Sequence, residues 1–253
     1  MLLAIDIGNS NIAFGIYREK WLQHWRLKTV VDKTSDEYEV LFRSLLANGQ
    51  DAHSGIEKIM ISCVVPSLRS TFQQMIKRMF NKSAVFIGPE LNTGIKVTID
   101  NPKEIGSDLL ANAVAGYAMF NSSCIVVDFG TALSITIVGS DGSLLGGSIA
   151  PGLETAMKAL SMNTAQLPFV ALSPPDSAIG KSTTHAIQSG VLFGYVGLVE
   201  YLVKRIRQEL GGTPKVIATG GLSEVIAPLT EQFDTLEPWL TLDGLRIIGE
   251  RLA

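Results

Sequence analysis

The sequence predicts an α/β protein built from two similar halves, each with the element order βββαβαβ. The main observation is a short signature that occurs twice in the 253 residues. An apolar run leads to Asp6 and Gly8, and about half the chain later a similar run leads to Asp128 and Gly130. Each run predicts a strand, and each glycine lets the backbone turn sharply into small polar residues. One Asp-x-Gly turn is common in hairpins, so the repeat and the elements around it carry the prediction.

Three strand-like runs open the first half and are joined by short polar turns, as in an antiparallel meander. They span Leu2–Ile7, Ile12–Tyr17 and Gln23–Lys28. Helical and strand-like segments then alternate over Ser35–Leu46, Lys58–Val65, Leu68–Phe80 and Ala84–Ile87. Thr34 or Ser35 is the expected N-cap of the first helix, and Gly49 is its expected stop. Pro66 is expected to break the strand before it.

A loop punctuated by Pro102 and Gly106 leads into the next helix, which runs to about Phe120. Ser107 is its expected N-cap, which places Asp108 in the first turn. The polar stretch 121–123 then separates this helix from the second Asp-bearing strand. We therefore expect an N-terminal half at 1–120 and a C-terminal half at 121–253.

The second half repeats the order of the first. Its expected strands and helices are Cys124–Asp128, Ser134–Val138, Leu144–Ile149, a helix after Pro151-Gly152, a long helix over Thr184–Leu210 and the strand Lys215–Thr219. The long helix has an apolar stripe wider than one contact with its own sheet needs, so we expect it near a dimer interface. The alternative is a helix buried within its own chain. The stripe contains Ile187, Val191, Leu198, Leu202 and Ile206, widened by Leu192, Val199 and Val203.

The composition predicts a globular protein without an electrostatic footprint for nucleic acid. Apolar residues make up 46% and charged residues 18%, and the net charge is −3. The two cysteines, Cys63 and Cys124, lie in apolar strand-like runs, which favours buried thiols over a disulfide framework or a zinc site. We expect no signal peptide, no membrane span and a cytoplasmic location.

The two Asp-Gly loops have the residue types that phosphate and cation sites need. A carboxylate at a strand end can hold a cation directly or through water. Backbone N–H groups opened by glycine, together with small hydroxyl residues, can approach phosphate oxygens closely. The strand that ends at Gly220 and Gly221 fits either a tight turn or a nucleotide site, and the two Asp loops favour the second interpretation.

Asp108 has two interpretations. Near a helix start, a carboxylate complements the helix dipole, and this effect contributes about 0.3–1 kcal/mol at an exposed site. A kinase that phosphorylates an alcohol also needs a carboxylate to accept the hydroxyl proton near the bound phosphates. The position of Asp108 suits both roles.

A series of ordered motifs resembles those of type III pantothenate kinases, within the actin-like ATPase and sugar kinase superfamily. The motifs are Asp6–Asn11, Ser62–Pro66, Asn101-Pro102 followed by Gly106–Asp108, Asp128–Ala132, Gly146–Gly152, Gly180–Thr183 and Ala218–Gly221. The resemblance implies duplicated actin-like (ribonuclease H-like) halves with a nucleotide cleft between them. It also implies ATP-dependent phosphorylation of pantothenate to 4'-phosphopantothenate, the first step toward coenzyme A, by a homodimer that uses Mg²⁺ and K⁺ or NH₄⁺.

The resemblance also implies a role for each matching residue. The catalytic base would be Asp108, Mg²⁺ would be organised by Asp6 through water, and the monovalent cation would be held by Asp128. The residues implied in ATP binding are Asp6, Ile7, Gly8, Asn9, Ser10, Asn11, Ile12, Ala13, Thr131, Gly220 and Gly221. The residues implied in substrate binding are Gly106, Ser107, Asp108, Leu109 and Thr183. Thr183 would complete the substrate site of a partner subunit, and an N-cap is its alternative role.

Two positions depart from the pattern that the resemblance implies. Leu109 stands where the family has Arg, and Ile99 stands where it usually has Tyr, so contacts each contributing about 1–3 kcal/mol are missing. Three interpretations follow: compensation by another residue such as Lys103 or Lys181, a changed acceptor, or a non-catalytic or regulatory ATP-binding paralogue. Retention of three carboxylates favours the enzyme. The short chain disfavours a sugar kinase or an acetate-kinase-like enzyme.

Overall fold

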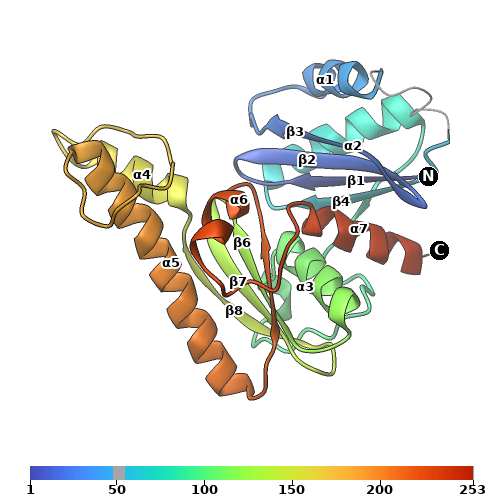
Figure 1. Cartoon of the computed structure of the whole chain (residues 1–253). Helices are drawn as coiled ribbons and strands as arrows, with labels where there is room; N and C mark the ends of the chain where they lie inside the picture. Colours follow the sequence, from blue (N-terminus) through green and yellow to red (C-terminus); the bar gives the residue numbers. More distant parts are fainter. Residues whose placement is uncertain (48–54, 253) are drawn as a thin grey trace. The chain divides into compact units, whose positions relative to one another are not determined.

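The computed structural model describes residues 1–47 and 55–252, and in these residues the chain forms two five-stranded mixed sheets (Figure 1). The predicted helix stop at Gly49 lies outside the described residues. The first sheet has the strand order β3-β2-β1-β4-β5 and the second the order β10-β9-β6-β7-β8. Read from its other edge, the second sheet repeats the first, so the predicted duplicated fold is confirmed.

The first sheet contains the three-stranded meander and two parallel strands. Its strands are β1 (Leu2–Ile7), β2 (Asn11–Arg18), β3 (Lys20–Lys28), β4 (Lys58–Cys63) and β5 (Val85–Phe86). Leu3, Ile5 and Ile7 of β1 alternate toward a buried core that they share with the helices α1 (Ser35–Ala47) and α2 (Pro66–Phe80). This period of two explains why the predicted bounds of β1 agree with the structure.

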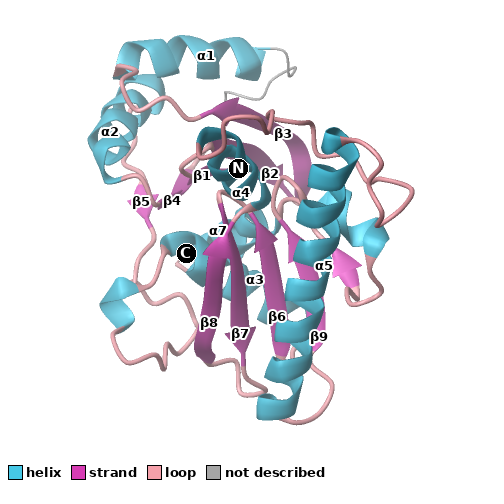
Figure 2. Cartoon of the chain, turned by 90° about the vertical axis from the view of Figure 1, so that its left-hand side faces the viewer, coloured by secondary structure: helices cyan, strands magenta, loops and turns pink. Residues whose placement is uncertain are grey.

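The second face of this sheet is covered by the C-terminal helix α7 (Leu240–Arg251). A side chain at Gly249 would collide with Leu2 and Met60, which belong to β1 and β4. Helix α3 (Ser107–Phe120) also contacts α7, because a side chain at Gly244 would collide with the Ala111 backbone. A short 3₁₀ helix over Pro102–Glu104 precedes α3. Figure 2 shows the first sheet and its helices from a second side.

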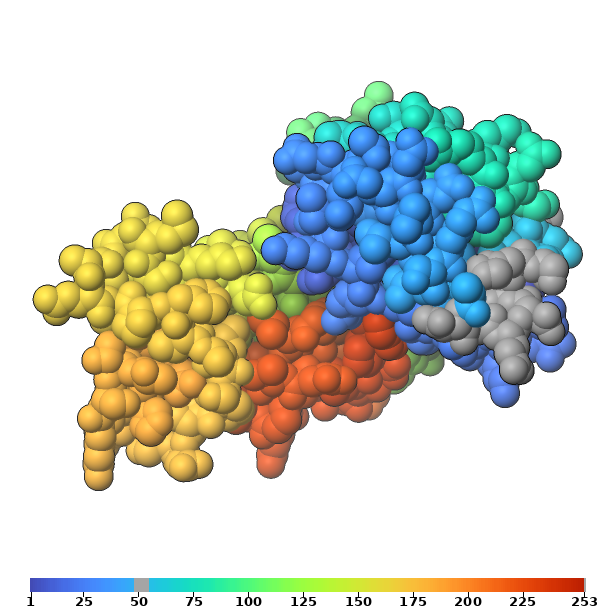
Figure 3. All heavy atoms as spheres, turned by 90° about the horizontal axis from the view of Figure 1, so that it is seen from above, coloured from blue at the N-terminus to red at the C-terminus, as the bar shows by residue number. Residues whose placement is uncertain are grey.

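The second sheet repeats the pattern of antiparallel and parallel pairs. Its strands are β6 (Cys124–Phe129), β7 (Ala132–Val138), β8 (Leu144–Pro151), β9 (Lys215–Thr219) and β10 (Thr235–Leu236). The helices that follow its first three strands are α4 (Leu153–Met162) and α5 (Thr183–Leu210), and α6 (Ser223–Ile226) continues into a 3₁₀ helix over Ala227–Leu229. The segment from α4 to the first turns of α5 is yellow to orange in Figure 3. It forms a projecting surface of the part of the chain that contains the second sheet.

Two compact units account for these elements: Met1–Ala115 with the residues from Thr241 onward, and Gly116–Leu240. The chain passes from the first unit to the second within α3, a few residues before the stretch that the sequence indicates. The larger difference is α7, which was expected with the C-terminal half but packs on the first sheet. Leu2 and Met60 are far from α7 in sequence, so no local sequence pattern predicts these contacts.

Several expected boundaries are corrected by the local chemistry. Pro66 does not only end a strand: it is at the first position of α2, where its missing N–H is harmless, and β4 already ends at Cys63. The predicted strand Ala84–Ile87 is shorter, because only Val85 and Phe86 pair with β4. Thr34 is confirmed as a cap, since the Glu37 N–H donates to its Oγ1 and its own N–H donates to the Glu37 carboxylate.

Both cysteines are free thiols, as predicted. Burial raises the pKa of Cys124 to about 12, so it is a structural residue. The pKa of Cys63, which is half-buried, is also raised by burial.

Among the described residues one helix, α5, is long and apolar enough to cross a membrane by length and composition. This is weak evidence, because the core helix of a globular protein passes the same test. Leu192, Val199 and Val203 of α5 pack in the core of the second unit. The expected stripe is therefore reassigned: the residues that widen it are the buried ones, whereas Val191, Leu198, Leu202 and Ile206 are only partly buried.

Candidate active site

The first Asp-Gly loop closes on its own backbone at the end of β1. The Gly8 N–H donates to the Asn11 carbonyl at 3.0 Å, and Thr29 holds the loop from β3 by donating its hydroxyl to the Gly8 carbonyl at 2.6 Å. Asp6, which is half-buried, is paired in register with Ala13 of β2. The loop thus presents a fixed backbone turn directly after the carboxylate. This geometry suits close approach of an anionic group.

Asp6 and Asp108 lie in the same unit and are linked through two serines. Asp6 of β1 is paired in register with Ser62 of β4, and the Ser62 and Ser107 hydroxyls are 2.9 Å apart. The Cys63 N–H donates to the Ser107 hydroxyl, also at 2.9 Å. Ser107 is therefore not the N-cap that the sequence indicates: it is the first residue of α3, and its side chain fastens the helix to the end of β4. The next residue along α3 is Asp108.

Asp108 is half-buried, and desolvation by burial raises the pKa of its carboxylate, although hydrogen bonds from the Leu109 and Asp108 N–H groups oppose the shift. The Leu109 N–H donates to Asp108 Oδ1 at 2.8 Å. A side chain at Gly106 would collide with the same oxygen, which explains the glycine there. A desolvated carboxylate with increased proton affinity can act as a general base.

The second Asp-Gly loop has a similar backbone closure in the second unit. The Gly130 N–H donates to the Ala132 carbonyl at 3.1 Å. The Thr131 carbonyl accepts from the Gly152 N–H at 3.0 Å and from the Thr155 hydroxyl at 2.7 Å, so α4 begins against this loop. A side chain at Gly152 would collide with the carbonyls of Gly130 and Thr131. The Thr131 side chain is left exposed beside the loop.

Gly220 lies directly against Asp128. Gly220 has a φ of +91°, and a side chain there would collide with Asp128 Oδ1 and the Phe129 backbone. The Ser223 hydroxyl donates to the Gly220 carbonyl at 2.7 Å, which holds the turn that contains Gly221. The structure therefore brings Asp128, Thr131 and the glycine pair together within the second unit.

The two units place equivalent residues around their Asp-Gly loops. Asp6 is paired with Ala13 and Ser62, whereas Asp128 is paired with Ser134 and Thr219, on strands in the same relative order. Both hydroxyl residues on the parallel neighbour, Ser62 and Thr219, are almost completely buried. The duplicated signature in the sequence is thus a duplicated local structure.

Thr183 does not join the Asp128 group within its own unit. It is the exposed first residue of α5, and Ser182, not Thr183, is the N-cap, because its hydroxyl accepts from the His185 N–H. Tyr195, further along α5, donates its hydroxyl to the Pro151 carbonyl beside the loop. Twelve residues of helix separate it from Thr183, which corresponds to about 18 Å. The predicted N-cap role of Thr183 is therefore wrong.

Comparison with known proteins decides the family. A model of the type III pantothenate kinase family matches residues 2–205. A curated type III pantothenate kinase from Geobacter sp. (strain M21) is 44% identical over 252 residues, which cover 99% of both chains. The chain belongs to the type III pantothenate kinase family. The family predicted from the ordered motifs is therefore confirmed.

Solved structures agree on the fold of this type III pantothenate kinase. A Baf-family protein from Campylobacter jejuni, described as a transcriptional activator, has a TM-score of 0.62 at 22% identity and covers 99% of this chain and 98% of its own. The activator of 2-hydroxyisocaproyl-CoA dehydratase from Clostridium difficile, solved with bound ADPNP, has a TM-score of 0.54 at 12% identity and covers 99% and 94%. At these identities the likeness shows the fold alone.

In this type III pantothenate kinase, the two departures lie in or before the segment that carries Asp108. Leu109 is half-buried in the first turn of α3, and Ile99 is half-buried in the loop before it. Lys103 and Lys181, the expected compensating cations, are both exposed. Leu109 itself brings no positive charge beside Asp108.

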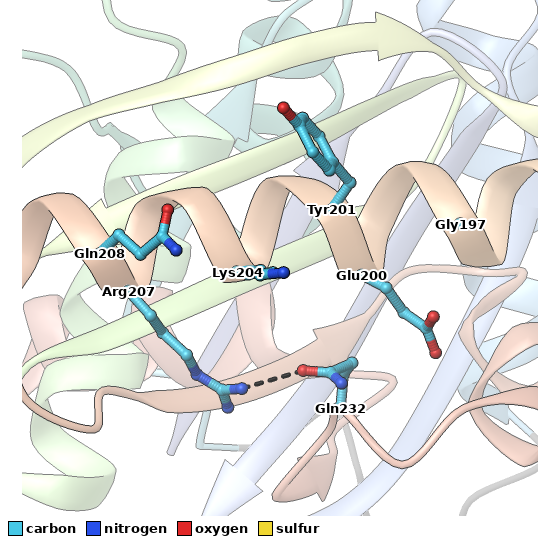
Figure 4. A pocket seen from close by; sticks show the side chains of 7 residues that line it. All are labelled: Gly197, Glu200, Tyr201, Lys204, Arg207, Gln208 and Gln232. Atoms are coloured by element: carbon cyan, nitrogen blue, oxygen red, sulfur yellow. Dashed lines mark hydrogen bonds between the residues drawn. The ribbon is translucent and has the colours of Figure 1, made fainter.

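A groove of about 600 Å³ lies away from all the predicted site residues, on the outer side of α5 (Figure 4). It is lined by Gly197, Glu200, Tyr201, Lys204, Arg207, Gln208 and Gln232. Arg207 donates to Gln232 at 2.9 Å and Glu200 accepts from Thr230 at 2.7 Å, so these two charged side chains already have partners.

The sequence-based argument assigned no role to several buried polar residues beside the site, although two of them lie in its motifs. Ser62 and Asn112 are fully buried, and Thr219 is almost so. Ser62 and Thr219 follow apolar runs at a strand end, a signal that could have been used. Asn112 has no such signal, because its partner Thr241 is 129 residues away in sequence.

Proposed function

We propose that the chain transfers the γ-phosphoryl group of ATP to the primary hydroxyl of pantothenate, with Asp108 as the general base. The family of curated kinases supplies the reaction class. The observation that carries the residue assignment is the link from Asp6 through Ser62 and Ser107 to Asp108 within one unit. It supports a base and a phosphate loop held by the same strand ends.

In this mechanism the Asp108 carboxylate accepts the hydroxyl proton while the hydroxyl oxygen attacks the γ-phosphorus. The new bond joins that oxygen to phosphorus, the bond to the β,γ-bridging oxygen breaks, and ADP leaves with its electrons. The raised pKa of Asp108 supports this role, because greater proton affinity favours proton transfer. A pH profile of turnover measures this pKa, because only the ionised carboxylate can accept the hydroxyl proton.

ATP is proposed to contact the loop 6–13, Thr131, Gly220 and Gly221. The backbone turns at Gly8 and Gly130 support phosphate contacts, because few side chains stand in the way there. The glycine pair ends β9 in a turn without side chains at these two positions, which supports a close approach of the nucleotide to the backbone. The related activator with bound ADPNP has the same fold, which is consistent with a nucleotide site.

Magnesium fits Asp6 as a single carboxylate ligand. Among residues 1–47 and 55–252 no group of three or more His, Cys, Asp or Glu side chains could form a protein-only cage. Mg²⁺ commonly keeps several waters and binds through one or two carboxylates and the substrate phosphates. When bound, it would neutralise developing phosphate charge.

A monovalent cation, K⁺ or NH₄⁺, is proposed at Asp128. The Asp128 carboxylate oxygen lies beside the backbone of the Gly220 turn and is a hard oxygen ligand. Such hard oxygen ligands suit an alkali cation. This assignment rests on the family resemblance and on that local chemistry.

A homodimer and a cytoplasmic location complete the proposal. Large apolar side chains are exposed on the second unit, most of all Ile149 at 74%, Met162 at 82% and Ile179 at 77%. Thr183 lies on the exposed side of α5, so it is free to face a second copy of the chain rather than its own Asp128 loop. These observations support a partner subunit that covers this surface and receives Thr183 at its substrate site.

The test is a direct assay of the purified chain with ATP, Mg²⁺ and pantothenate, in K⁺ and in Na⁺ buffers. We expect ADP release matched by a phosphorylated product, higher turnover with K⁺, and a loss of about 10²–10⁴-fold in Asp108→Asn. The K⁺ response should vanish in Asp128→Ala. A protein that binds ATP but phosphorylates neither pantothenate nor pantetheine would contradict the kinase assignment.

The assay also addresses the missing arginine. If other groups already bind the substrate carboxylate, Leu109→Arg should change the KM for pantothenate by only a few-fold. A large gain in turnover from near background would instead indicate a chain that has lost its activity.

A further inference from the structure

Helix α3 is fastened on the N-terminal side of Asp108 by the serine contacts. Ser107 accepts from the Cys63 N–H and shares a hydrogen bond with the buried Ser62. These contacts fix where the helix begins. They do not fix the direction of the helix axis, which also determines where the Asp108 carboxylate points. A second anchor further along α3 is needed for that.

The second anchor lies one turn after Asp108, at the contact with α7. The Thr241 hydroxyl donates to Asn112 Oδ1 at 2.8 Å, and Asn112 is fully buried. Residues four apart lie on the same side of a helix, so Asn112 is directly below Asp108 along the axis. The Ala111 carbonyl packs so closely against Gly244 that any side chain at Gly244 would collide with it. Figures 1 and 2 both show α3 beside α7.

Helix α7 is itself held by hydrogen bonds to three other parts of the first unit. Trp21 Nε1 donates to Asp243 Oδ1 at 2.8 Å, Lys58 Nζ donates to the Gly249 carbonyl at 2.6 Å, and Arg251 donates to the Thr93 carbonyl at 2.8 Å. These partners lie on or near β3, β4 and the loop after β5. The helix is therefore a fixed support against which α3 can be aligned.

We propose that Thr241 and Asn112 form a positioning pair that sets the orientation of Asp108, so that the C-terminal helix contributes to turnover without touching the substrate. The inference rests on the proposed role of Asp108 as the base. Asn112 is fully buried and close-packed with α7, so a change at this contact is transmitted to the helix axis instead of being absorbed by solvent. Misplacement of a catalytic group by about 1 Å can cost up to 10²-fold in rate.

The test replaces Thr241 by Val, which keeps the shape and removes the hydroxyl donor. We expect kcat for pantothenate phosphorylation to fall about 10-fold while the KM for ATP stays within about 2-fold. Thr241→Ser keeps the donor and should restore most of kcat. Thr230→Val is the matched control, because it makes the same substitution and removes a hydroxyl hydrogen bond to Glu200 away from α3 and α7, so kcat should stay within about 2-fold after correction for the folded fraction.

The Asp108→Asn background separates positioning from general destabilisation. If Thr241 acts only through the carboxylate, Thr241→Val should cause no further loss of turnover in Asp108→Asn. Equal losses of kcat in Thr241→Val and Thr230→Val would overturn the inference, as would an unchanged kcat in Thr241→Val. Failure of the proposed function is distinguishable: wild-type protein without turnover, or full turnover in Asp108→Asn, removes the base and overturns both proposals.

Discussion

At the scale of single residues, Asp108 shows how a site can oppose the stability of the fold. Its carboxylate sits in a largely desolvated position, and the pKa is raised by that burial. The charged form of such a carboxylate has a higher free energy in the folded chain than in the unfolded chain, and this difference destabilises the fold. The hydrogen bonds from Leu109 and from its own N–H offset only part of this cost, since the direction of the shift remains upward.

The first prediction is that Asp108→Asn increases thermal stability at pH 7 while turnover is lost. The amide keeps an oxygen that can accept from the Leu109 N–H, but it carries no charge to desolvate. In the wild type the folded chain binds this proton more tightly, so stability falls as the pH rises from the ordinary aspartate pKa through the raised one. The advantage of the variant should therefore be fully present above that window and shrink below it.

Thermal unfolding of both proteins across pH 4 to 8 measures this difference. Asp32→Asn, at an exposed aspartate in the turn before α1, is the control for a change in net charge. A variant that melts below the wild type at pH 7 would show that the Asp108 charge is stabilised by its surroundings and that burial is not the dominant effect.

The sequence predicted the local settings of the candidate site residues better than it predicted their contacts. Asp6, Asp108 and Asp128 were identified as strand-end and helix-start carboxylates, and their local settings agree with the structure. Ser107 was expected to cap a helix and instead bonds to β4. A hydroxyl can accept from any nearby N–H, and the Cys63 N–H is 44 residues away in sequence.

At the scale of elements, glycines determine how the helices approach the Asp loops. Gly152 lies between β8 and α4 with ordinary extended backbone angles, so conformational freedom is not its reason. Its reason is space, because the carbonyls of Gly130 and Thr131 occupy the volume that a side chain would need. The start of α4 can therefore donate hydrogen bonds directly to the second loop.

The second prediction follows from that contact. Gly152→Ala should lower the free energy of unfolding by roughly 1–3 kcal/mol, because backbone atoms must move to admit the methyl group. Turnover should fall as well, since the loop that moves carries Thr131. Gly88→Ala is the matched control, because nothing lies within 4 Å of a side chain there, and it should change the free energy by less than about 0.5 kcal/mol. Urea unfolding and the kinase assay measure both effects, and equal behaviour of the two variants would refute the steric explanation.

The order of the elements was predictable because each has a local cause. The period of two in β1 and the reciprocal Thr34 and Glu37 hydrogen bonds are readable from short windows. The short strand β10 lacks such a signal, since it has only two residues, and the strand count of the second sheet was incomplete without it. The length of an element therefore decided whether the sequence predicted it.

At the scale of the whole molecule, the duplication was predictable and the path of the chain between the units was not. The two Asp-Gly signatures predict two similar sheets, and the strand orders of the two sheets agree with each other. The return of α7 to the first unit depends on small residues at Gly244 and Gly249 and on Trp21 and Thr241. These contacts join residues more than a hundred positions apart, which periodicity does not reveal.

Helix α5 has two different faces, and this explains why its composition resembles that of a membrane helix. One face packs in the core through Leu192, Val199 and Val203. The opposite face is exposed and contains Gly190, Gly194 and Gly197, with open space around each. Glycine inside an exposed helix costs up to about 1 kcal/mol relative to alanine, so three of them on one face have no local benefit. Close approach of the backbone of another helix would make these three glycines favourable.

The third prediction is that the chain is a dimer in which this glycine face of α5 meets a second copy. Light scattering at micromolar concentration should give twice the chain mass of 27.2 kDa. Gly194→Leu should shift the mass toward the monomer, because the added side chain prevents two helices from approaching closely. Thr183 lies on the same face, at helical spacing from Gly190 and Gly194, so turnover should fall with the loss of the dimer if Thr183 serves the partner's substrate site.

Glu209→Leu separates the shape of the glycine face from a general effect of added apolar surface. Glu209 is exposed on the same helix, outside the line of glycines, and its replacement adds the same side chain without filling the space beside Gly194. Its mass and turnover should therefore match the wild type. A monomeric wild-type chain with full turnover would exclude a dimer-dependent site, and the exposed glycines would then need another partner. A dimer that survives Gly194→Leu would instead place the interface elsewhere, with the exposed Ile149 of β8 and Met162 of α4 as the next surface to change.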